Sequence, residues 1–406
     1  MSSGEIAIRG ICETEIERFL RVLGEAYGRN ITDAYIEAWR GSFDYRRNLA
    51  LFLGGRLVGT ATAGAVTVTV PGPRQVRAVV TGNLTVDRRA EVPGLGRELF
   101  RAQCRRHREE GEPFLVFSVT GREMDMLHRA IGSAPMTDSM VIRAVLRQPE
   151  TTGPGRSSPA VAVEELDLLS PELDNVHERV APTTPGMIVR DRSWMRTYRT
   201  LSAAADPVPS VWAHRGPDGL FDGYALWSVT GRGEGRRVTV EEFTTATPGA
   251  WNEIIGELAN ITTHLEMRNC RTDDAALWWL SRRGQITHRE LRHALWIRII
   301  NVPAALRARR YFATGRIRLE VVDSFLPQAA GRFLFETRDG HAECGPTTGA
   351  ADVRLTIGAL GALYLGHTDP RALALAGLIE SEDDAAVARL GRLMAGPHVP
   401  WSGSER

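Results

Sequence analysis

The stretch that most constrains the fold of this chain runs from residue 76 to residue 99, VRAVVTGNLTVDRRAEVPGLGREL. A run rich in β-branched residues is followed by a short loop with glycines at positions 94 and 96, and then by apolar residues at helical spacing. This order predicts a strand, a tight loop and a helix, as in α/β folds. Glycines let a backbone approach an anion, and a helix N-terminus favours negative charge. The pattern indicates either an anion-binding loop or a plain turn.

Chain length and composition limit the class of protein. With 406 residues, the chain exceeds what one hydrophobic core usually serves, so we expect two or three domains. Hydrophobic residues make up 43% and charged residues 24%, and no run is apolar and long enough to span a bilayer. The first residues, MSSGEIAIRG, lack the apolar core of a secretory signal, so we expect cytoplasmic residence and no membrane partner.

The basic and sulfur-bearing residues exclude several chemistries. The formal net charge is +1, which gives no global field for nucleic acid, and apart from His every basic side chain is Arg, so lysine catalysis is excluded. We interpret the arginine clusters at 101–108 and 282–292 chiefly as solvated faces. The cysteines lie far apart without a C-x-x-C pair, which indicates buried free thiols and neither a metal site nor a disulfide framework. They are Cys12, Cys104, Cys270 and Cys344.

Hydrophobic periodicity gives the element order of the first block, residues 1–150. We expect a helix within 5–28, a strand from Asn48 to Val58 closing on the turn Gly54-Gly55, and two further strands joined at Pro71-Gly72-Pro73. A helix, a strand, a short helix and a last strand follow, so the order is αβββαβαβ. This order predicts a mixed sheet with helices against it.

Composition then separates two further blocks. Residues 151–159, TTGPGRSSP, lack periodicity and predict a linker. In the block at 160–300 we expect helices at 171–179 and 193–201, strands at 210–214 and 223–229, then VTVEEFTTA, a helix from Ala250 and a strand near Trp296. This order of helix, strands, helix and strand repeats that of the first block, without a counterpart of the Gly-x-Gly loop. The last block, 301–406, contains LEVVD, RFLFETRDGHAECGPT and DVRLTIGALGALYLG in that order.

The motifs of the last block, together with ALWIRIINVPAALRARRY before them, resemble the C-terminal sterol-carrier-like domain of the Eis family of acetyltransferases. The resemblance implies an α/β (α+β) chain with tandem GNAT-like mixed sheets flanked by helices, followed by a sterol-carrier-like α+β domain. It also implies a closed homo-oligomer, with a hexamer expected, and an acyl-CoA co-substrate without a tightly bound cofactor.

The glycine loop is similar to motif A of GNAT acyltransferases, in which a strand ending in Val is followed by R/Q-x-x-G-x-G/A. The resemblance assigns donor binding to Val86, Val92, Gly94, Leu95, Gly96 and Arg97. Glu91 stands where the motif has Arg or Gln, and Pro93 removes one backbone N–H from the turn. Because an acidic residue next to a diphosphate is unfavourable, these two departures weaken the donor-site interpretation more than the fold.

The same family implies where the acid and the base lie. The segment LHRAIGSAP, residues 127–135, corresponds to a family segment with a Tyr acid, and His128 replaces that Tyr. Imidazole can donate or accept a proton near pH 7, whereas the alternative is a surface histidine without a role. The family's base is the C-terminal carboxylate, which here belongs to Arg406, with Glu405 as a neighbouring acceptor contact. Trp401 and the nearby prolines favour a docked tail over a frayed end.

Residues for the amine acceptor are fewer. The family's acidic acceptor residue falls on Asn30, and the aromatic residues Tyr27, Trp39 and Tyr45 could line a pocket or belong to the core. We therefore expect an acceptor that is less cationic than an aminoglycoside.

The sequence leaves three functions open. The first is an N-acyltransferase that moves an acyl group from acyl-CoA to a small-molecule amine, in secondary metabolism or self-resistance. The second uses aminoacyl-tRNA as the acyl donor, which would give the arginine clusters a role. The third is a non-catalytic binding or scaffold protein.

Overall fold

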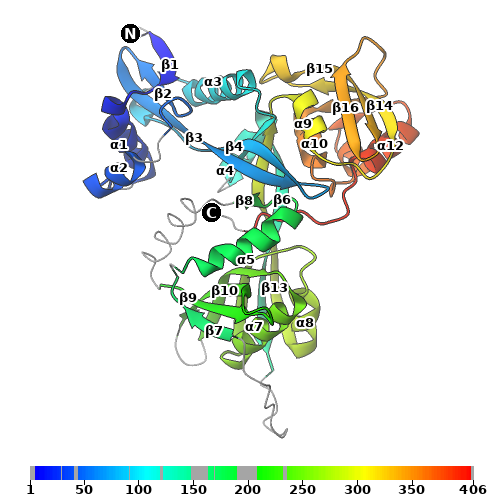
Figure 1. Cartoon of the computed structure of the whole chain (residues 1–406). Helices are drawn as coiled ribbons and strands as arrows, with labels where there is room; N and C mark the ends of the chain where they lie inside the picture. Colours follow the sequence, from blue (N-terminus) through cyan, green and yellow to red (C-terminus); the bar gives the residue numbers. More distant parts are fainter. Residues whose placement is uncertain are drawn as a thin grey trace, which may run out of the picture.

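The computed structural model describes residues 5–28, 30–40, 44–90, 92–118, 122–147, 163–168, 170–189, 208–231 and 236–403. Three units are visible in Figure 1: the N-terminal unit in blue and cyan, a second unit in green, and a third in yellow to red. The linker predicted at 151–159 and the helix predicted at 193–201 lie outside the described residues. The predicted boundaries between the blocks stay predictions.

Groups of helices and strands alternate along the described part of the first unit. Its elements are β1 (Ile6–Gly10), α1 (Ile16–Tyr27), α2 (Asp33–Arg40), β2 (Leu49–Leu53), β3 (Arg56–Val70), β4 (Arg74–Val86), α3 (Leu95–Glu109), β5 (Phe114–Phe117), α4 (Arg122–Ala130) and β6 (Ala134–Leu146). The helix predicted within 5–28 is α1, and the predicted turn at Gly54-Gly55 is confirmed. Residues 6–10 form a strand paired with β2 that was not predicted, and the segment 48–58 contains β2, the turn and the start of β3 instead of one strand. The run IAIRG is too short and too exposed for its pattern to separate strand from helix.

Alternation along β2 explains how helices come to cover both faces of the sheet. Ala50 and Phe52 join the core under α1 and α2, whereas Leu49 and Leu51 join the core under α3. Because successive side chains of a strand point to opposite faces, α1 and α2 lie on one face and α3 on the other. Figure 1 shows the two groups of helices on opposite sides of the blue strands.

The second unit continues the same sheet. Its elements are β7 (Val163–Leu166), α5 (Glu172–Val180), β8 (Ile188–Val189), β9 (Ser210–Arg215), β10 (Phe221–Thr230), β11 (Arg237–Thr245), α7 (Pro248–Asn260), β12 (His264–Cys270), α8 (Ala276–Arg283) and β13 (Gly284–Ile299). β12 and α8 were not predicted from the sequence. The strand order is β1-β2-β3-β4-β5-β13-β6-β12-β11-β10-β9-β7, with β8 beside β3.

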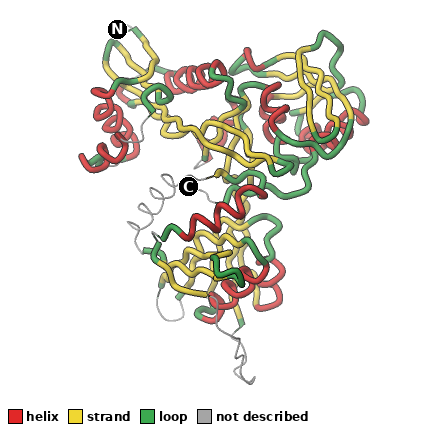
Figure 2. Tube along the Cα trace, viewed as in Figure 1, coloured by secondary structure: helices red, strands yellow, loops and turns green. Residues whose placement is uncertain are grey.

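Strand β13 binds the two units together. Its C-terminal part pairs with β5, from Trp296 opposite Phe117 to Ile299 opposite Phe114, and nearly its whole length pairs with β6. β6 in turn pairs with β12 on its other side. The tandem mixed sheets predicted from the sequence are therefore one continuous sheet, and Figure 2 shows its strands running from one unit into the next.

The third unit has its own five-stranded sheet, ordered β16-β15-β14-β17-β18. Its elements are α9 (Val302–Ala308), β14 (Gly315–Val322), β15 (Gly331–Arg338), β16 (His341–Pro346), β17 (Val353–Thr356), α10 (Ile357–Leu363), α11 (Pro370–Leu375), β18 (Ile379–Glu380) and α12 (Asp384–Met394). One hydrophobic core joins this unit to the first, because Ala78 and Phe114 cluster with Leu319 and Leu360. The α/β (α+β) fold class with two sheets and flanking helices is confirmed.

Buried polar contacts fix the position of the third unit. Arg298 of β13 and Asp323 are both buried, and a guanidinium nitrogen of Arg298 lies 2.6 Å from a carboxylate oxygen of Asp323. The other oxygen of Asp323 accepts hydrogen bonds from the N–H groups of Phe325 and Leu326. The pair therefore holds Phe325 in the core beneath α3.

No helix in the described part of the chain is long and apolar enough to cross a bilayer.

Candidate active site

The parallel strands β4 and β5 cease to pair at the centre of the first unit, and we call the point where their pairing ends the opening. In the described chain these parallel strands pair only through Val79 opposite Leu115 and Val80 opposite Val116. β4 continues to Val86, whereas β5 ends at Phe117. The edge of β4 beyond Val80 is thus left without β5 as a partner, and its backbone groups can bind a ligand.

A bulge in β4 lies beside this opening. Thr60 of β3 is opposite Thr85, but Thr62 is opposite Gly82, so Asn83 and Leu84 together face one residue of β3. Asn83 has φ of 48°, in the left-handed region. A bulge of this kind turns backbone N–H groups out of the regular ladder. It offers donors that could polarise a carbonyl group placed in the opening.

Side chains from two elements hold the bulge in place. Thr62 Oγ1 donates to the carbonyl of Gly82 and accepts from the side-chain amide of Asn83, at 2.9 and 3.2 Å. The buried Gln103 of α3 donates to the carbonyl of Thr62 and accepts from Thr81 Oγ1, both at 3.0 Å. Thr62, Gln103 and Thr81 were not predicted as residues of the site. A Gly-Asn pair inside a strand pattern is the signal that could have located the bulge.

The predicted donor residues gather at the start of α3. Gly94 is the N-cap residue with φ of 84°, a conformation that suits glycine, and a Cβ added there would meet no atom within 4 Å. Glycine is therefore favoured at position 94 by the backbone conformation and not by crowding from neighbouring atoms. A Cβ on Gly96 would lie 3.7 Å from Val86, an ordinary contact. Leu95 is buried and anchors the helix.

The remaining loop residues face solvent. Val92 is 40% exposed, and Arg97 is exposed with its guanidinium 5.4 Å from the centre of the Phe325 ring. Glu91 lies outside the described residues. The first turn of α3 therefore combines free helix N–H groups with a nearby cation, which fits the phosphates of a donor.

His128 lies in an aromatic enclosure next to the open end of β5. Its ring centre is 4.5 Å from that of Phe117, 6.0 Å from Phe100 and 6.2 Å from Trp296. The residue is only 8% exposed, so the alternative of a surface histidine was wrong. Leu84 of the bulge packs against the same cluster. The fold thus brings His128, the bulge and the end of β5 together.

A cysteine in the same cluster is not suited to covalent catalysis. Cys104 of α3 is fully buried, and burial raises the pKa of its thiol to about 12. A thiol is a nucleophile only as the thiolate, so Cys104 cannot form an acyl-enzyme near pH 7. The expectation of buried cysteines holds for Cys104, Cys270 and Cys344 and was wrong for Cys12, which is exposed. No group of three or more metal-binding side chains occurs among the described residues.

The C-terminal tail is docked up to the last residue that is described. The N–H of Trp401 donates to the carbonyl of Pro185 at 2.8 Å, and its indole Nε1 donates to the carbonyl of Asn269, also at 2.8 Å. Its side chain packs against Ala181 and Met187. This agrees with the docked tail predicted from Trp401. Arg406 and Glu405 lie outside the described residues.

The tail also passes α4. Val399 and Pro400 line a cavity of about 190 Å³ together with Arg129, the residue after His128. Gly186 allows the tail to approach, because a Cβ there would lie 3.1 Å from the carbonyl oxygen of Trp401. The described part of the tail therefore lies along the side of the first unit that carries α4.

The predicted acceptor residues lie on α1 and α2. Tyr27 is 51% exposed at the end of α1, Asn30 is exposed in the following loop, and Trp39 is half-buried on α2. Trp39 and Tyr45 both pack against the core under these helices, and the ring of Trp39 lies 6.2 Å from that of Tyr35. Tyr27 and Asn30 thus face solvent, while Trp39 partly serves the core.

Comparison with known proteins decides the family. The acetyltransferase (GNAT) domain matches residues 7–128 and again 186–299, and the sterol carrier protein domain matches residues 302–403. An uncharacterized N-acetyltransferase of Streptomyces avermitilis is 30% identical over 382 residues, which cover 90% of each chain. The chain belongs to the GNAT family of N-acetyltransferases.

Within the GNAT family the similarity extends to Eis proteins. The N-acetyltransferase Eis of Mycobacterium tuberculosis is 32% identical over 241 residues, which cover 55% of this chain and 54% of that protein. The crystal structure of Eis1 from Mycobacterium abscessus has the same fold, with a TM-score of 0.81 over 98% of this chain and 99% of the other, at 24% identity. This GNAT protein is therefore an Eis-like N-acyltransferase with two GNAT domains and a sterol-carrier-like domain.

Proposed function

We propose that this enzyme transfers an acyl group, with acetyl as the first candidate, from acyl-CoA to an amine of a small molecule, in the opening between β4 and β5. The observation that carries the proposal is the bulge at Asn83 beside an unpaired strand edge, with the N-terminus of α3 and His128 next to it. Diphosphate would bind the N–H groups at Gly94 to Gly96, with Arg97 nearby. The thioester carbonyl would accept a hydrogen bond from the bulge.

Two groups of the chain, one acting as base and one as acid, would then carry out the proton transfers. A carboxylate takes a proton from the ammonium of the acceptor, and the free amine attacks the thioester carbonyl carbon. The new C–N bond forms while the C–S bond breaks, and the thiolate receives a proton from the imidazolium of His128. The nitrogen then releases its second proton, which restores the imidazolium. We assign the base to the carboxylate of Arg406, with Glu405 contacting the acceptor. Three residues follow Gly403, so this carboxylate can reach about 11 Å beyond it.

The acceptor is inferred to be less cationic than an aminoglycoside. Asn30 supplies no negative charge where the family has an acidic residue. The exposed Met126, at 68%, and Leu127, at 44%, precede His128 on α4, and Tyr27 is half-exposed on α1. An amine with an apolar body fits these side chains better than a polycation, which needs several carboxylates.

The second hypothesis is that aminoacyl-tRNA is the acyl donor. The contacts of three arginines on α3 argue against it. Arg101 contacts Glu98 and the carbonyl of Phe325, Arg106 contacts Glu110, and Arg108 donates to the carbonyl of Ile300. These cations are engaged within the chain. The scaffold hypothesis has no specific support, because the opening, the bulge and the docked tail would serve no purpose in it.

Calorimetry with acetyl-CoA tests the donor site. Gly94→Asp adds a negative charge at the phosphate position, and Gly111→Asp is a matched control, since Gly111 has φ of 83° and equally open surroundings. We expect loss of acetyl-CoA binding only for Gly94→Asp. Gly96→Ala adds a methyl group that the protein tolerates. Weaker binding of acetyl-CoA by this variant would therefore indicate that the added methyl group contacts the ligand. Absence of binding by any CoA ester to the parent protein would overturn the proposal, and a salt-dependent gel shift with charged tRNA would then support the second hypothesis.

Steady-state kinetics test the two catalytic groups. His128→Phe should lower kcat by about 100-fold with little change in donor affinity, whereas His341→Phe, at an exposed site of the third unit, should change neither. A Gly-Ser extension after Arg406 should inactivate the enzyme without lowering its melting temperature, once intact mass has verified that the parent chain ends at Arg406. Full activity of the extended protein would remove the carboxylate from the mechanism.

The same proposal includes assembly as a closed homo-oligomer, with a hexamer expected from the Eis resemblance. Light scattering at micromolar concentration should give about six times the chain mass of 44.7 kDa. A monomer at that concentration would contradict it.

A further inference from the structure

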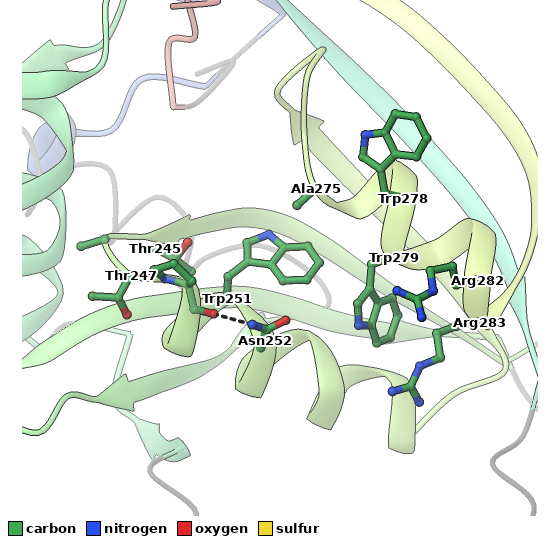
Figure 3. Close-up of a pocket in the computed structure, with 11 residues that line it drawn as sticks. Thr245, Thr247, Trp251, Asn252, Ala275, Trp278, Trp279, Arg282 and Arg283 are labelled. Atoms are coloured by element: carbon green, nitrogen blue, oxygen red, sulfur yellow. Dashed lines mark hydrogen bonds between the residues drawn. The ribbon is translucent and has the colours of Figure 1, made fainter.

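A second concave site lies far along the chain from the donor loop, in the second unit. The cavity has a volume of about 810 Å³ and lies between the first turns of α7 and the outer face of α8. Figure 3 shows the side chains that face it. Its volume is within the range of small-molecule sites, which is about 300 to 1,000 Å³. None of the residues in the proposed acyl-transfer site lines it.

Three tryptophans form the apolar part of this cavity. Trp251 comes from α7, and Trp278 and Trp279 come from α8. The rings of Trp251 and Trp279 have centres 6.3 Å apart at an angle of 76°, so they form two walls of a corner. Trp278 stands at the rim with 76% of its surface exposed. Large exposed aromatic surface around a cavity indicates a ligand with a flat apolar body.

Two arginines supply the charge of the cavity. Arg282 and Arg283 lie at the end of α8, and among the described residues neither guanidinium has a carboxylate within 4.0 Å. The guanidinium of Arg283 lies 5.2 Å from the centre of the Trp279 ring, so cation and aromatic wall adjoin. Both arginines can donate several hydrogen bonds and cannot accept any.

Two polar side chains on the opposite side, those of Thr247 and Asn252, already have hydrogen-bond partners within the chain. Thr247 accepts the N–H of Ala250 as the N-cap of α7 and donates to Asp222, at 3.1 and 2.6 Å. The amide of Asn252 donates to the carbonyl of Pro248 at 2.9 Å, as Figure 3 shows. The formal charge in the cavity is therefore that of the two guanidinium groups, and the indole N–H groups add further donors. An anionic oxygen group is the partner that suits these donors best.

We propose that this cavity of the second GNAT domain binds a small planar aromatic carboxylate, whose ring packs against Trp251 and Trp279 and whose carboxylate pairs with Arg282 and Arg283. The inference is independent of the acyl-transfer mechanism, because no residue of the two sites is shared. It gives the second GNAT domain a binding role although that domain has no Gly-x-Gly donor loop.

Calorimetry on the full chain with two probes of the same shape tests the proposal. The probes are 1-naphthoate and 1-naphthylmethanol, which differ in charge. We expect saturable binding of naphthoate below about 1 mM and at least about tenfold weaker binding of the alcohol. Arg282→Gln/Arg283→Gln should weaken naphthoate about tenfold and leave the alcohol unchanged. Arg289→Gln/Arg292→Gln, which also removes two exposed arginine charges but outside the cavity, is the charge-matched control.

Aromatic variants provide the second test. Trp279→Leu should weaken both probes and abolish quenching of tryptophan fluorescence by naphthoate. Trp278→Ala removes an exposed ring and cannot disturb the core, so it remains informative if Trp279→Leu misfolds. Equal binding of the two probes, unchanged affinity in the double arginine variant, or no saturable binding below about 1 mM would each overturn the proposal. Light scattering that shows Trp278→Ala dispersing an oligomer would instead assign the surface to a second copy of the chain, and would also overturn it.

Discussion

The indole Nε1 of Trp401 donates a hydrogen bond to the carbonyl oxygen of Asn269, at a distance of 2.8 Å. The donor lies close to the end of the chain, and the acceptor lies in β12 of the second unit, 132 positions earlier. Asn269 itself has φ of 55°, in the left-handed region, which turns its backbone out of the regular strand. The second unit thus holds the tail whose end we assign to catalysis in the first unit.

Loss of this anchor should separate catalysis from donor binding. Trp401→Ala removes the indole, its hydrogen bond and its packing against Met187, so the tail should detach. We expect kcat to fall about 100-fold while affinity for acetyl-CoA measured by calorimetry stays within about twofold. Leu220→Ala, which removes an exposed apolar side chain from the same unit, should leave kcat unchanged. Normal turnover by Trp401→Ala would show that the docked tail does not position a catalytic group.

The buried pair of Arg298 and Asp323 should be more sensitive to losing one charge than to losing both. Asp323→Asn keeps an oxygen for the N–H groups of Phe325 and Leu326 but leaves the buried guanidinium without its counter-ion, at a cost of about 3 kcal/mol. Arg298→Met/Asp323→Asn removes the buried charge as well. Urea unfolding should therefore show the double variant to be more stable than Asp323→Asn. The reverse order would mean that the ion pair is not the main stabilising contact here.

Acid should remove one identifiable contribution to stability. Glu15 accepts two hydrogen bonds from Arg9, at 2.8 and 2.9 Å, and this guanidinium together with the N–H of Cys12 lowers the pKa of Glu15 to about 2. In the unfolded chain the pKa of Glu is about 4.3. A lowered pKa stabilises the fold above the unfolded value, and this stabilisation is lost as pH falls toward 2.

The comparison with Glu15→Gln measures that contribution. The melting temperature of the parent protein should exceed that of Glu15→Gln by a constant amount from pH 7 to about 5, and the difference should disappear between about pH 4.3 and 2. Melting curves at matched ionic strength provide the measurement. A difference that is independent of pH would attribute the effect to the loss of shape or packing.

Thiol reactivity should distinguish Cys12 from the other cysteines. Cys12 is exposed, whereas burial raises the pKa of Cys104 and of Cys344 to about 12 and also raises that of Cys270. Titration of the native protein with Ellman's reagent should give one fast-reacting thiol, and denaturant should release all four. Cys12→Ser should abolish the fast phase. A second fast thiol in the native protein would contradict the burial of the remaining three.

Local patterns were enough to predict the parts of the site that depend on neighbouring residues. The loop with Gly94 and Gly96 lies between a strand and a helix as predicted, because a positive φ and a helix start depend on nearby residues alone. The bulge was missed since a bulge is defined by the partner strand, and the partner Thr62 is far from Asn83 in sequence. The enclosure of His128 combines Phe100, Phe117 and Trp296 from three elements, so no local pattern describes it.

The arrangement of the sheet was the least predictable part of the fold. The alternation of β13 predicts a strand near Trp296, but it carries no information about which strands lie beside it. That position depends on the burial of Trp296 and Ile297 against side chains of the first unit. The resemblance to Eis proteins supplied the order of the domains and not the sharing of strands between them.

Insertion of β13 beside β5 has a consequence for the synthesis of this protein. Phe117 leaves the ribosome long before its partner Trp296, and the sheet of the first unit stays incomplete until residue 299 has been translated. At the usual speed of elongation this interval is about 10 to 40 s. During that time β5 presents an open edge made of four consecutive apolar residues. Nascent chains that stall before residue 299 should therefore depend on chaperones, and any fragment ending near residue 150 should aggregate.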